Sequence, residues 1–325
     1  MNQRLILVTG ATGFIGPHLL QSLLNEGFNI RVATPDKPKL ESSQIEWICT
    51  DFTNPTNYLD LVRGCKTIYH LAAQLENSDL MYKVNVESSR LLAEAAEQED
   101  CEVFIGVSTV GIYGTPNMRI VDESSSLINQ QSRNSFYHVE YNYNYCITKL
   151  LSEKAIIASA KKVKYVFPRL SNVVDIVKLK AFFEHSRLTR LWRSPRWTHH
   201  IYIEDVIAGF LYLENWARIN LSEGEHEIFN LSDGDYLKEH KFRNFYSIDR
   251  KQNFSCFAES LTQGIPSLPI KYLDWLKDAV KYRDPFNGIS AGYTTYSNKK
   301  ILETGFVYPK GIKSIYNDLR SGYIM

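Results

Sequence analysis

The chain has 325 residues, of which 44% are hydrophobic and 22% are charged, proportions typical of a globular protein with a sizeable core. They exclude a disordered or fibrous chain, and the length suits one large α/β unit with a smaller attached lobe. Lysine and arginine (37) balance aspartate and glutamate (36), so the net charge predicts neither nucleic acid nor an acidic membrane surface as a partner.

The cysteines and the apolar runs indicate the cellular compartment of the protein. Its five cysteines are odd in number and contain no Cys-x-x-Cys pair, which argues against a disulfide framework and a zinc site and fits a reducing compartment. The N-terminal apolar run is too short for a signal peptide, and no apolar run reaches the about 18 residues of a membrane-spanning helix. We therefore expect a cytoplasmic protein without a metal site or a membrane-spanning helix.

Short apolar runs rich in β-branched residues alternate with amphipathic stretches through the first half of the chain. This alternation predicts βαβ units and a doubly wound parallel sheet, which is an α/β fold. Strands are expected at 5–8, 30–33, 67–70, 103–107, 164–167, 201–203 and 227–231. Helices are expected at 15–24, 80–97 and 144–160, from Glu204 onward, and at 270–282.

Gly10, Gly13 and Gly16 follow the first expected strand and open the first expected helix. The first glycine permits a tight turn off the strand, the second lets the backbone approach a pyrophosphate, and the third lets the helix pack closely on the sheet. The start of the helix adds free N–H groups and the positive end of its dipole. The pattern predicts a dinucleotide-binding Rossmann site rather than a glycine-rich turn without a ligand.

The end of the second expected strand bears on which dinucleotide binds. An acidic residue there favours NAD through the ribose hydroxyls, and a basic residue favours NADP through the 2′-phosphate. The stretch 31–37 carries neither at the tip of the strand. The sequence therefore leaves both NAD and NADP open.

Further motifs follow the glycine turn over the first two thirds of the chain. They are Asp51-Phe52, His70-Leu71-Ala72-Ala73, Val84-Asn85-Val86, Ser108-Thr109-Val110-Gly111-Ile112-Tyr113-Gly114, Tyr145-Cys146-Ile147-Thr148-Lys149 and Pro168-Arg169-Leu170-Ser171-Asn172-Val173. In this order they resemble the extended short-chain dehydrogenase/reductase family, in particular its NAD-dependent nucleotide-sugar epimerase and dehydratase branch. Such an ordered set is more specific than any single motif.

The resemblance implies roles for particular residues, and it implies a homodimer. The residues implied to hold NAD or NADP are Gly10, Thr12, Gly13, Phe14, Ile15, Gly16, Asp51, Phe52, Leu71, Ala72, Ala73, Asn85, Tyr145 and Lys149. The implied catalytic residues are Tyr145, Lys149 and Thr109, and the candidate substrate-binding residues are Ser108, Asn172 and Arg196. We expect a dinucleotide-binding Rossmann domain over 1–172, to which 201–231 returns, and a smaller mixed α/β substrate lobe over 173–200 and 232–325.

Tyr145 and Lys149 are four residues apart, so on a helix they share one face with Cβ atoms about 5 to 6 Å apart. A free tyrosine has a pKa of about 10 and is a poor base at neutral pH. A lysine ammonium about 4 Å away is worth on the order of 4 kcal/mol at an effective dielectric of 20, and it would lower the tyrosine pKa by up to about 3 units. We therefore expect Tyr145 to act as the acid and base of the reaction.

Either of two neighbouring hydroxyl residues could act together with Tyr145. Thr109, at the end of an expected strand, could share a proton with Tyr145 or could cap the turn that follows, and Ser108 could be the partner instead. A second Tyr-x-x-x-Lys pattern, from Tyr296 to Lys300, has no Ser/Thr segment at a sheet edge before it. In a chain with 20 tyrosines we interpret it as a chance match.

The chain departs from sugar-nucleotide enzymes at three places. Val174-Asp175-Ile176 replaces their usual aromatic residue, glycine and proline. Thr198 stands where they often carry an arginine for the substrate diphosphate, with Arg196 slightly upstream. The interval from Ala73 to Asn85 is shorter than in those enzymes. These departures leave the substrate class less defined than the fold and the cofactor.

The resemblance implies hydride transfer at a secondary alcohol or ketone, with a sugar nucleotide as the substrate. Epimerisation is favoured over dehydration, because Val110-Gly111 stands where dehydratases commonly carry an Asp-Glu pair. One alternative is a dehydrogenase or reductase of a non-nucleotide alcohol or ketone, like the hydroxysteroid and flavonol enzymes of the same superfamily. A second alternative is a non-catalytic sensor that binds NAD or NADP.

Overall fold

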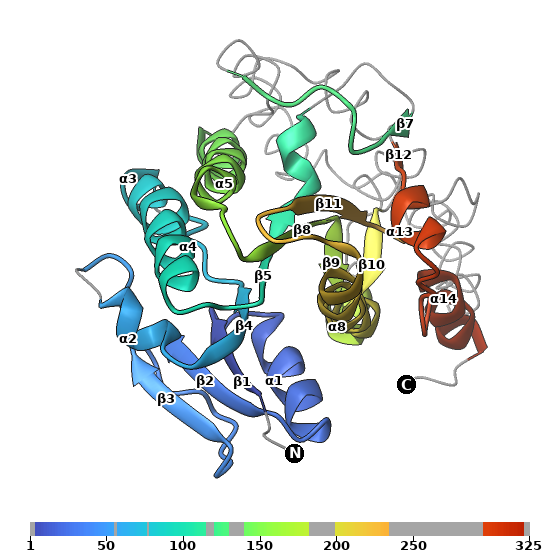
Figure 1. Cartoon of the computed structure of the whole chain (residues 1–325). Coiled ribbons are helices and arrows are strands. Elements are labelled where there is room, and N and C mark those ends of the chain that lie inside the picture. The colour runs from blue at the N-terminus through green and yellow to red at the C-terminus, as the bar shows by residue number, and fades with distance from the viewer. Residues whose placement is uncertain are drawn as a thin grey trace, which may run out of the picture.

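The computed structural model describes residues 4–54, 57–76, 78–114, 120–129, 140–181, 199–233 and 295–321. Its main element is an eight-stranded sheet in the order β11-β8-β5-β4-β1-β2-β3, with β6 paired to β8 (Figure 1). The strands are β1 (Leu5–Thr9), β2 (Asn29–Thr34), β3 (Ile45–Cys49), β4 (Cys65–His70), β5 (Val103–Gly106), β6 (Ser108–Thr109), β8 (Lys164–Leu170) and β11 (His226–Leu231). Every strand pair in this sheet is parallel, which confirms the predicted doubly wound α/β fold.

Helices cover both faces of the sheet (Figure 1). One face carries α1 (Gly16–Asn25) and α8 (Ile203–Asn220), and the other carries α2 (Tyr58–Val62), α3 (Ser78–Tyr82), α4 (Ser88–Gln98) and α5 (Glu140–Ser159). Side chains along β1 alternate between the two layers, because Ile6 and Val8 pack in the core with α1 and α8 while Leu7 packs in the core with α2, α4 and α5. This alternation explains why the central strands are hydrophobic throughout.

The sheet changes direction next to β1. Its two neighbours are β2 and β4, and the chain builds the sheet outward from β1 first on one side and then on the other. In open α/β sheets a ligand binds at the carboxyl ends of the strands beside such a switch point. The glycine turn follows β1 and therefore lies at that place.

The remaining described strands form two small sheets, and the remaining described α-helices are three in number. Strand β9 (Asn172–Val174) pairs with β10 (His200–Tyr202), and β7 (Ile120–Val121) pairs with β12 (Thr295–Tyr296). The helices are α6 (Ile176–Ala181), α13 (Lys299–Glu303) and α14 (Ile312–Ser321). Buried residues of α13 and α14, among them Ile301, Ile312 and Tyr316, belong to the same core as α1 and α8.

The structure differs from the sequence-based prediction at several elements. The predicted strand at 201–203 exists as β10, but it pairs with β9 rather than with the main sheet. Strand β3 was not predicted, because a half-exposed strand at the edge of a sheet lacks a continuous apolar run. The predicted helix over 80–97 is interrupted by a π-helical turn at Lys83–Glu87. The helix expected at 270–282 lies outside the described residues, and the domain division stays a prediction.

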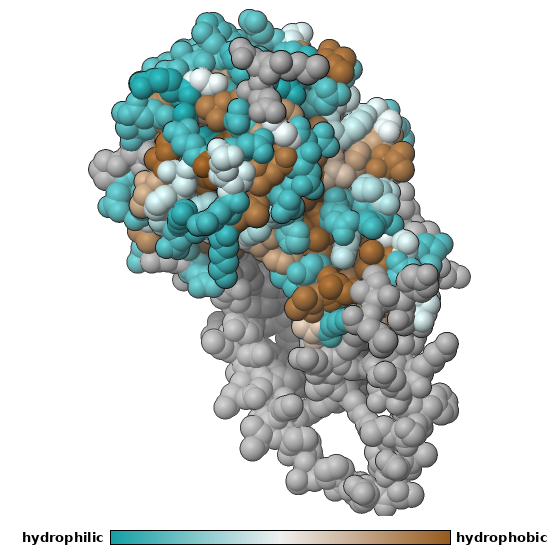
Figure 2. Space-filling view, turned by 90° about the horizontal axis from the view of Figure 1, so that it is seen from below, coloured by the Kyte–Doolittle hydropathy of each residue, from teal (hydrophilic) through white to brown (hydrophobic). Residues whose placement is uncertain are grey.

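Most of the described surface on the face shown in Figure 2 is hydrophilic, with hydrophobic residues scattered between the polar ones. Individual exposed hydrophobic side chains include Val177, Ile219 and Val307. Within the described ranges, no helix combines the length and the apolar character that crossing a bilayer requires.

Candidate functional site

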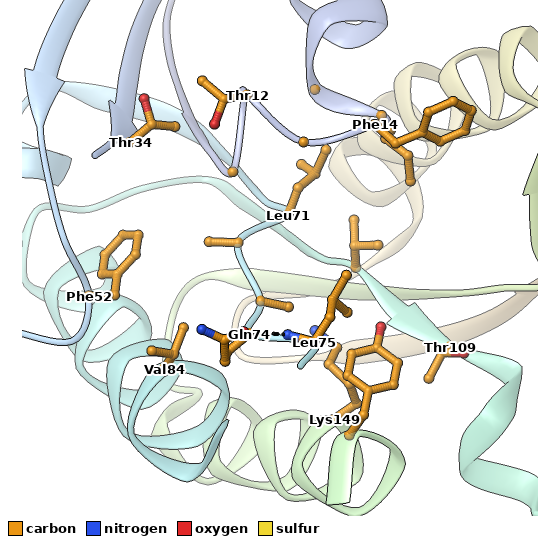
Figure 3. Close-up of a pocket in the computed structure, with 18 of the residues that line it drawn as sticks. Thr12, Phe14, Thr34, Phe52, Leu71, Gln74, Leu75, Val84, Thr109 and Lys149 are labelled. Carbon is orange, nitrogen blue, oxygen red and sulfur yellow. Dashed lines mark hydrogen bonds between the residues drawn. The ribbon is translucent and has the colours of Figure 1, made fainter. Parts of the chain in front are cut away.

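A cavity of about 490 Å³ lies at the carboxyl ends of β1, β2, β4, β6 and β8. It contains most of the residues that the sequence singled out, although they are spread over 140 positions from Gly10 to Lys149. The predicted residues that line it are Gly10, Thr12, Gly13, Phe14, Ile15, Gly16, Asp51, Phe52, Leu71, Ala72, Ala73, Ser108, Thr109, Tyr145 and Lys149. In Figure 3, Thr34 and Phe52 lie on one side of this cavity and Thr109 on the other, with Gln74 and Leu75 between them.

The three glycines of the turn are required for different reasons. Gly10 has φ +68°, and a Cβ atom there would lie 2.6 Å from the backbone nitrogen of Ala72. A Cβ atom at Gly16 would lie 2.4 Å from the carbonyl of Ala11. At Gly13 the nearest atom to an added Cβ is the carbonyl oxygen of Gly10 at 3.3 Å. The fold therefore needs Gly10 and Gly16, whereas Gly13 leaves open space toward the cavity.

Asp51 and Phe52 follow β3 at the end of the cavity that Thr34 also lines. The Asp51 carboxylate accepts hydrogen bonds from the Thr53 backbone nitrogen at 2.9 Å and from the Asn54 side chain at 2.7 Å. The bonds from Thr53 are the main influence that lowers the pKa of Asp51. Asp51 is therefore a fixed carboxylate that can accept hydrogen bonds from a ligand.

Buried polar side chains hold the cavity wall that follows β4. Thr9 Oγ1 and His70 Nδ1 are 2.8 Å apart, and His70 Nε2 lies 2.7 Å from Ser89 Oγ. The backbone nitrogen of Ala72 donates to Thr9 Oγ1 at 3.2 Å. Burial lowers the pKa of His70 to about 3, so this ring is neutral near pH 7 and serves as a hydrogen-bonding spacer.

Asn85 lies behind the wall of the cavity rather than on it. Its Oδ1 accepts from the Gln74 backbone nitrogen at 2.7 Å, and its Nδ2 donates to the Gln74 carbonyl at 3.1 Å and to Thr148 Oγ1 at 3.0 Å. Gln74 lines the cavity, and Thr148 precedes Lys149 on α5. Asn85 therefore ties the loop after β4 to the helix that carries the Tyr-Lys pair.

Tyr145 and Lys149 both lie on α5 and both line the cavity. Burial raises the pKa of Tyr145, and burial lowers the pKa of Lys149 to about 8, with the Glu153 carboxylate acting in the opposite direction on Lys149. The expectation that Lys149 lowers the pKa of Tyr145 is wrong for this structure. Desolvation disfavours the charged form of both groups, and it is the main cause of both shifts.

Ser108 and Thr109 end the β5–β6 segment and line the cavity beside this pair. Thr109 Oγ1 accepts from the backbone nitrogen of Gly111 at 3.1 Å, so Thr109 caps the 3₁₀ turn at Val110–Tyr113. This capping bond uses the oxygen as an acceptor and leaves the hydroxyl proton free to be donated. Ser108 is 3% exposed, and its hydroxyl has no partner among the described residues.

Sequence reasoning assigned no site role to a second set of lining residues. They are Ala33, Thr34, Pro35, Thr53, Gln74, Leu75, Val84, Val107, Leu170, Ser171 and Val173. Most of them lie at or just beyond the carboxyl ends of strands. A sequence signal existed for these, since the ends of the expected strands at 30–33 and 164–167 already marked the same edge of the sheet.

Some predicted residues lie away from the cavity. Asn172 is exposed on β9 and is absent from the lining, although its neighbours Ser171 and Val173 belong to it. Arg196 and the other arginines of that segment lie outside the described residues. Tyr296 stacks on Tyr113 away from the cavity, and Lys300 forms an ion pair with Glu227, in agreement with the interpretation of this second pattern as a chance match.

The site fits a nicotinamide dinucleotide at the glycine turn. The open space at Gly13, next to the start of α1, suits a pyrophosphate, because nothing in the fold itself requires a glycine there. No group of three or more His, Cys, Asp or Glu within the described ranges is arranged to hold a metal ion.

Comparisons with known proteins agree with this geometry. A model of the NAD dependent epimerase/dehydratase family matches residues 6–194. The chain is similar to vestitone reductase from Medicago sativa, with 22% identity over 246 residues, which cover 64% of this chain and 72% of the reductase. It is also similar to a 3-beta-hydroxysteroid dehydrogenase from Mycolicibacterium neoaurum, with 27% identity over 168 residues, which cover 47% of this chain and 42% of that enzyme.

Solved structures show the same fold. WbmG from Bordetella bronchiseptica in complex with NAD has a TM-score of 0.67 at 17% identity, and the match covers 99% of this chain and 94% of WbmG. UDP-glucuronic acid 4-epimerase from Bacillus cereus in complex with NAD has a TM-score of 0.54 at 22% identity, and the match covers 70% of this chain and 78% of the epimerase.

Proposed function

Because the chain belongs to the NAD dependent epimerase/dehydratase family, and is thereby an NAD(P)-dependent enzyme, we propose that it transfers a hydride at the carbon of a secondary alcohol or ketone. The observation that carries this proposal is that Tyr145, Lys149 and Thr109 line the same cavity as the glycine turn. NAD or NADP, when bound, takes up or supplies the hydride. The protein supplies binding, orientation and the movement of the proton.

The sheet topology gives the direction in which the dinucleotide would lie. The adenosine half would lie toward β2 and β3, where Asp51 can accept from the ribose or the adenine ring. The pyrophosphate would lie at Gly13 and the start of α1, whose backbone N–H groups suit an anion. The nicotinamide half would then lie toward β5 and β8, beside Tyr145 and Lys149.

Tyr145 would move the proton of the reacting oxygen. Its raised pKa keeps the phenol protonated, which is the form that donates to the oxygen of a ketone during reduction. Lys149 would hold the nicotinamide ribose and place a positive charge beside the phenol. The Thr109 or Ser108 hydroxyl would hydrogen-bond the same substrate oxygen, because both residues line the cavity beside Tyr145.

Epimerisation of a sugar nucleotide is the first candidate reaction. The fold likeness includes UDP-glucuronic acid 4-epimerase, which supports this substrate class by analogy. Val110 and Gly111 form the 3₁₀ turn after Thr109, so the Asp-Glu pair that dehydratases commonly carry there is replaced by groups without acid or base chemistry. This favours epimerisation over dehydration.

Reduction of a non-nucleotide ketone, or oxidation of the alcohol, is the second candidate. It is favoured by the similarity to vestitone reductase and to the hydroxysteroid dehydrogenase. It is also favoured by Leu75, which lines the cavity and is 52% exposed, because an apolar side chain there suits an apolar substrate.

A single assay separates the two candidates. Purified protein is incubated with UDP-sugars and a trace of NAD, and separately with steroid and flavonoid ketones and stoichiometric NADH or NADPH. An epimerase interconverts UDP-sugars without net change of the cofactor, whereas a reductase consumes it. Tyr145→Phe is expected to lower turnover by about 10²- to 10⁴-fold, and Tyr143→Phe on the same helix is the control. Equal turnover of wild type and Tyr145→Phe would refute the role of Tyr145.

We further propose that the protein is a homodimer in the cytoplasm, as the family resemblance implies. Light scattering after gel filtration is expected to give twice the chain mass of 37.5 kDa. A mass equal to one chain at micromolar concentration would contradict the dimer.

A further inference from the structure

Lys149 has to carry its charge in surroundings that disfavour it. The residue is 4% exposed, and it reaches from α5 to the cavity that it lines (Figure 3). Burial favours the neutral amine, which is a weaker hydrogen-bond donor than the ammonium and places no positive charge beside Tyr145. The role given to Lys149 above therefore requires a group in the fold that favours the ammonium.

A buried carboxylate stands one turn further along the same helix. Glu153 follows Lys149 by four residues on α5, so the two side chains lie on one face of the helix. Glu153 is 3% exposed, and little water screens its charge there. Burial lowers the pKa of Lys149 and the Glu153 carboxylate raises it, so that the pKa comes to about 8.

Arg169 determines how Glu153 can act on the ammonium. Both carboxylate oxygens of Glu153 accept from Arg169, at 3.1 Å from Nε and at 2.7 Å from Nη2. These two charge-assisted bonds keep the buried carboxylate ionised. In the part of the chain that the structure describes, Lys149 has no ion pair of its own. Glu153 therefore acts on Lys149 through space and leaves the three ammonium donors to a ligand.

We propose that Glu153 is a positioning residue that keeps the Lys149 ammonium charged without bonding to it, and that Arg169 keeps Glu153 ionised. This inference rests on the proposed function, in which Lys149 holds the nicotinamide ribose. The pair of Glu153 and Arg169 then does more than attach α5 to β8, because it also supplies a negative charge behind the site. Opposite charges alternate from Lys149 at the cavity through Glu153 to Arg169 in the core.

The other described elements that pack against Lys149 and α5 offer no equivalent charge. His70 of β4 is neutral near pH 7. Tyr145 of α5 and Tyr113 of the 3₁₀ turn are neutral as well, because burial raises the pKa of both. The charged residues of α3, α4 and the π-helical turn between them are exposed or half-exposed, and water screens them; they are Asp79, Lys83, Glu87, Arg90, Glu94 and Glu97.

The first measurement is the pKa of Lys149 in the ligand-free protein. Competitive labelling of lysines with acetic anhydride over a series of pH values, read by mass spectrometry, gives this pKa, with the exposed Lys154 as the internal reference. Glu153→Gln is expected to lower the pKa of Lys149 by about one pH unit, because it removes the nearby anion. Glu153→Asp keeps the anion and is expected to leave the pKa close to that of wild type.

The second measurement follows binding. The affinity for the better-bound of NADH and NADPH is titrated between about pH 6 and 10. It is expected to fall as Lys149 loses its proton, with a midpoint near pH 8 in wild type and in Glu153→Asp. In Glu153→Gln the midpoint is expected about one pH unit lower.

A double variant covers the case in which Glu153→Gln does not fold. Glu153→Met combined with Arg169→Met replaces the buried ion pair by apolar side chains of similar size, an exchange that proteins often tolerate without loss of stability. It leaves no uncompensated charge in the core. Because it also lacks the carboxylate, it is expected to show the same lowered pKa of Lys149 and the same lowered midpoint of binding as Glu153→Gln.

Three results would overturn the inference and leave the proposed function standing. One is a wild-type pKa of Lys149 in Glu153→Gln or in the double variant. Another is an equal fall of this pKa in Glu153→Asp, which would show that Glu153 acts through its geometry and not through its charge. The third is a dinucleotide affinity that does not follow the titration of Lys149. A wild type that binds neither NADH nor NADPH at any pH would instead refute the proposed function, and the positioning role with it.

Discussion

At the scale of single residues, Gly13 differs from Gly10 and Gly16 in the space that an added Cβ atom would find. Gly10 adopts a positive φ, and added Cβ atoms at Gly10 and Gly16 would meet backbone atoms within 2.6 Å. An added Cβ at Gly13 has only the Gly10 carbonyl nearby, at 3.3 Å, which small shifts can relieve. The sequence pattern does not distinguish the three glycines, and only the coordinates separate the two that the fold needs from Gly13, which it does not.

Gly13→Ala is therefore expected to fold with a free energy of unfolding within about 1 kcal/mol of wild type. Its affinity for NADH or NADPH is expected to fall by more than about tenfold, because the methyl group occupies the space of the pyrophosphate. Urea unfolding and a binding titration measure the two quantities. Gly16→Ala is the comparison, with a large loss of stability expected. Wild-type dinucleotide binding by Gly13→Ala would contradict this assignment.

The buried Lys149 makes the stability of the folded protein depend on pH. Burial lowers its pKa from 10.5 to about 8, whereas the unfolded chain keeps the ordinary value. Below about pH 8 the lysine is charged in both states, so the folded protein carries the full cost of burying the charge, about 3 kcal/mol. Between pH 8 and 10.5 the unfolded state binds more protons, so this cost declines as the pH rises.

Lys149→Met is thus expected to be more stable than wild type at pH 7 in the absence of ligands, with a gap that shrinks toward pH 10. Urea unfolding at both pH values measures the gap. Lys154→Met, at an exposed lysine on the same helix, is the control, and no such pH-dependent gap is expected for it. A gap for Lys149→Met that is the same at both pH values would show that the lysine charge is not buried at a cost.

At the scale of elements, a buried ion pair fixes α5 against β8. Arg169 donates from Nε and Nη2 to the two carboxylate oxygens of Glu153 at 3.1 and 2.7 Å, and from Nη1 to the Tyr113 hydroxyl at 2.8 Å. Glu153 lies one turn after Lys149, so the pair sets the position of the helix that carries the candidate acid and base. The bidentate geometry also fixes the rotation of that helix.

Glu153→Gln is expected to lower the free energy of unfolding by about 3–5 kcal/mol, because it leaves the Arg169 charge buried without its carboxylate. Thermal or urea unfolding measures the loss. Glu94→Gln breaks the ion pair with Arg90 on α4, whose side chains are 41% and 44% exposed, and is expected to cost less than about 1 kcal/mol. Similar losses of unfolding free energy in the two variants would show that the buried ion pair contributes no more to stability than the exposed one.

At the scale of the whole molecule, the C-terminal segment closes the core over α8. Tyr316 of α14 is 1% exposed, and its hydroxyl lies 2.8 Å from His200 Nδ1. Asp205 at the start of α8 accepts from the backbone nitrogens of Lys310 and Gly311 at 2.7 and 2.9 Å. Residues more than 100 positions apart therefore stabilise one another, and the described end of the chain is part of the body that carries the site.

Tyr316→Ala is expected to destabilise the protein by about 3–5 kcal/mol through loss of buried aromatic packing. Val307→Ala removes a side chain that is 77% exposed, and it is expected to change stability by less than about 0.5 kcal/mol. Urea unfolding of both variants provides the comparison. A loss below 1 kcal/mol for Tyr316→Ala would show that α14 is not needed to close the core.

The sequence by itself determined the class of the fold and the residues of the glycine turn and the Tyr-Lys pair. Strand and helix periodicity are local, and each motif carries its chemistry in adjacent residues, as in Gly10 to Gly16 and Tyr145 to Lys149. The edge strand β3 escaped prediction because half-exposed strands lack a strong apolar pattern.

Only the tertiary structure decided which residues share the cavity and what their surroundings do to them. In the structure Ser171 and Gln74 line the cavity, whereas Asn85 lies behind its wall and Asn172 lies outside it. It also reversed the expected effect on Tyr145, whose pKa burial raises. Burial and long-range contacts depend on strands that meet only after folding, so the periodicity of a single segment cannot contain them.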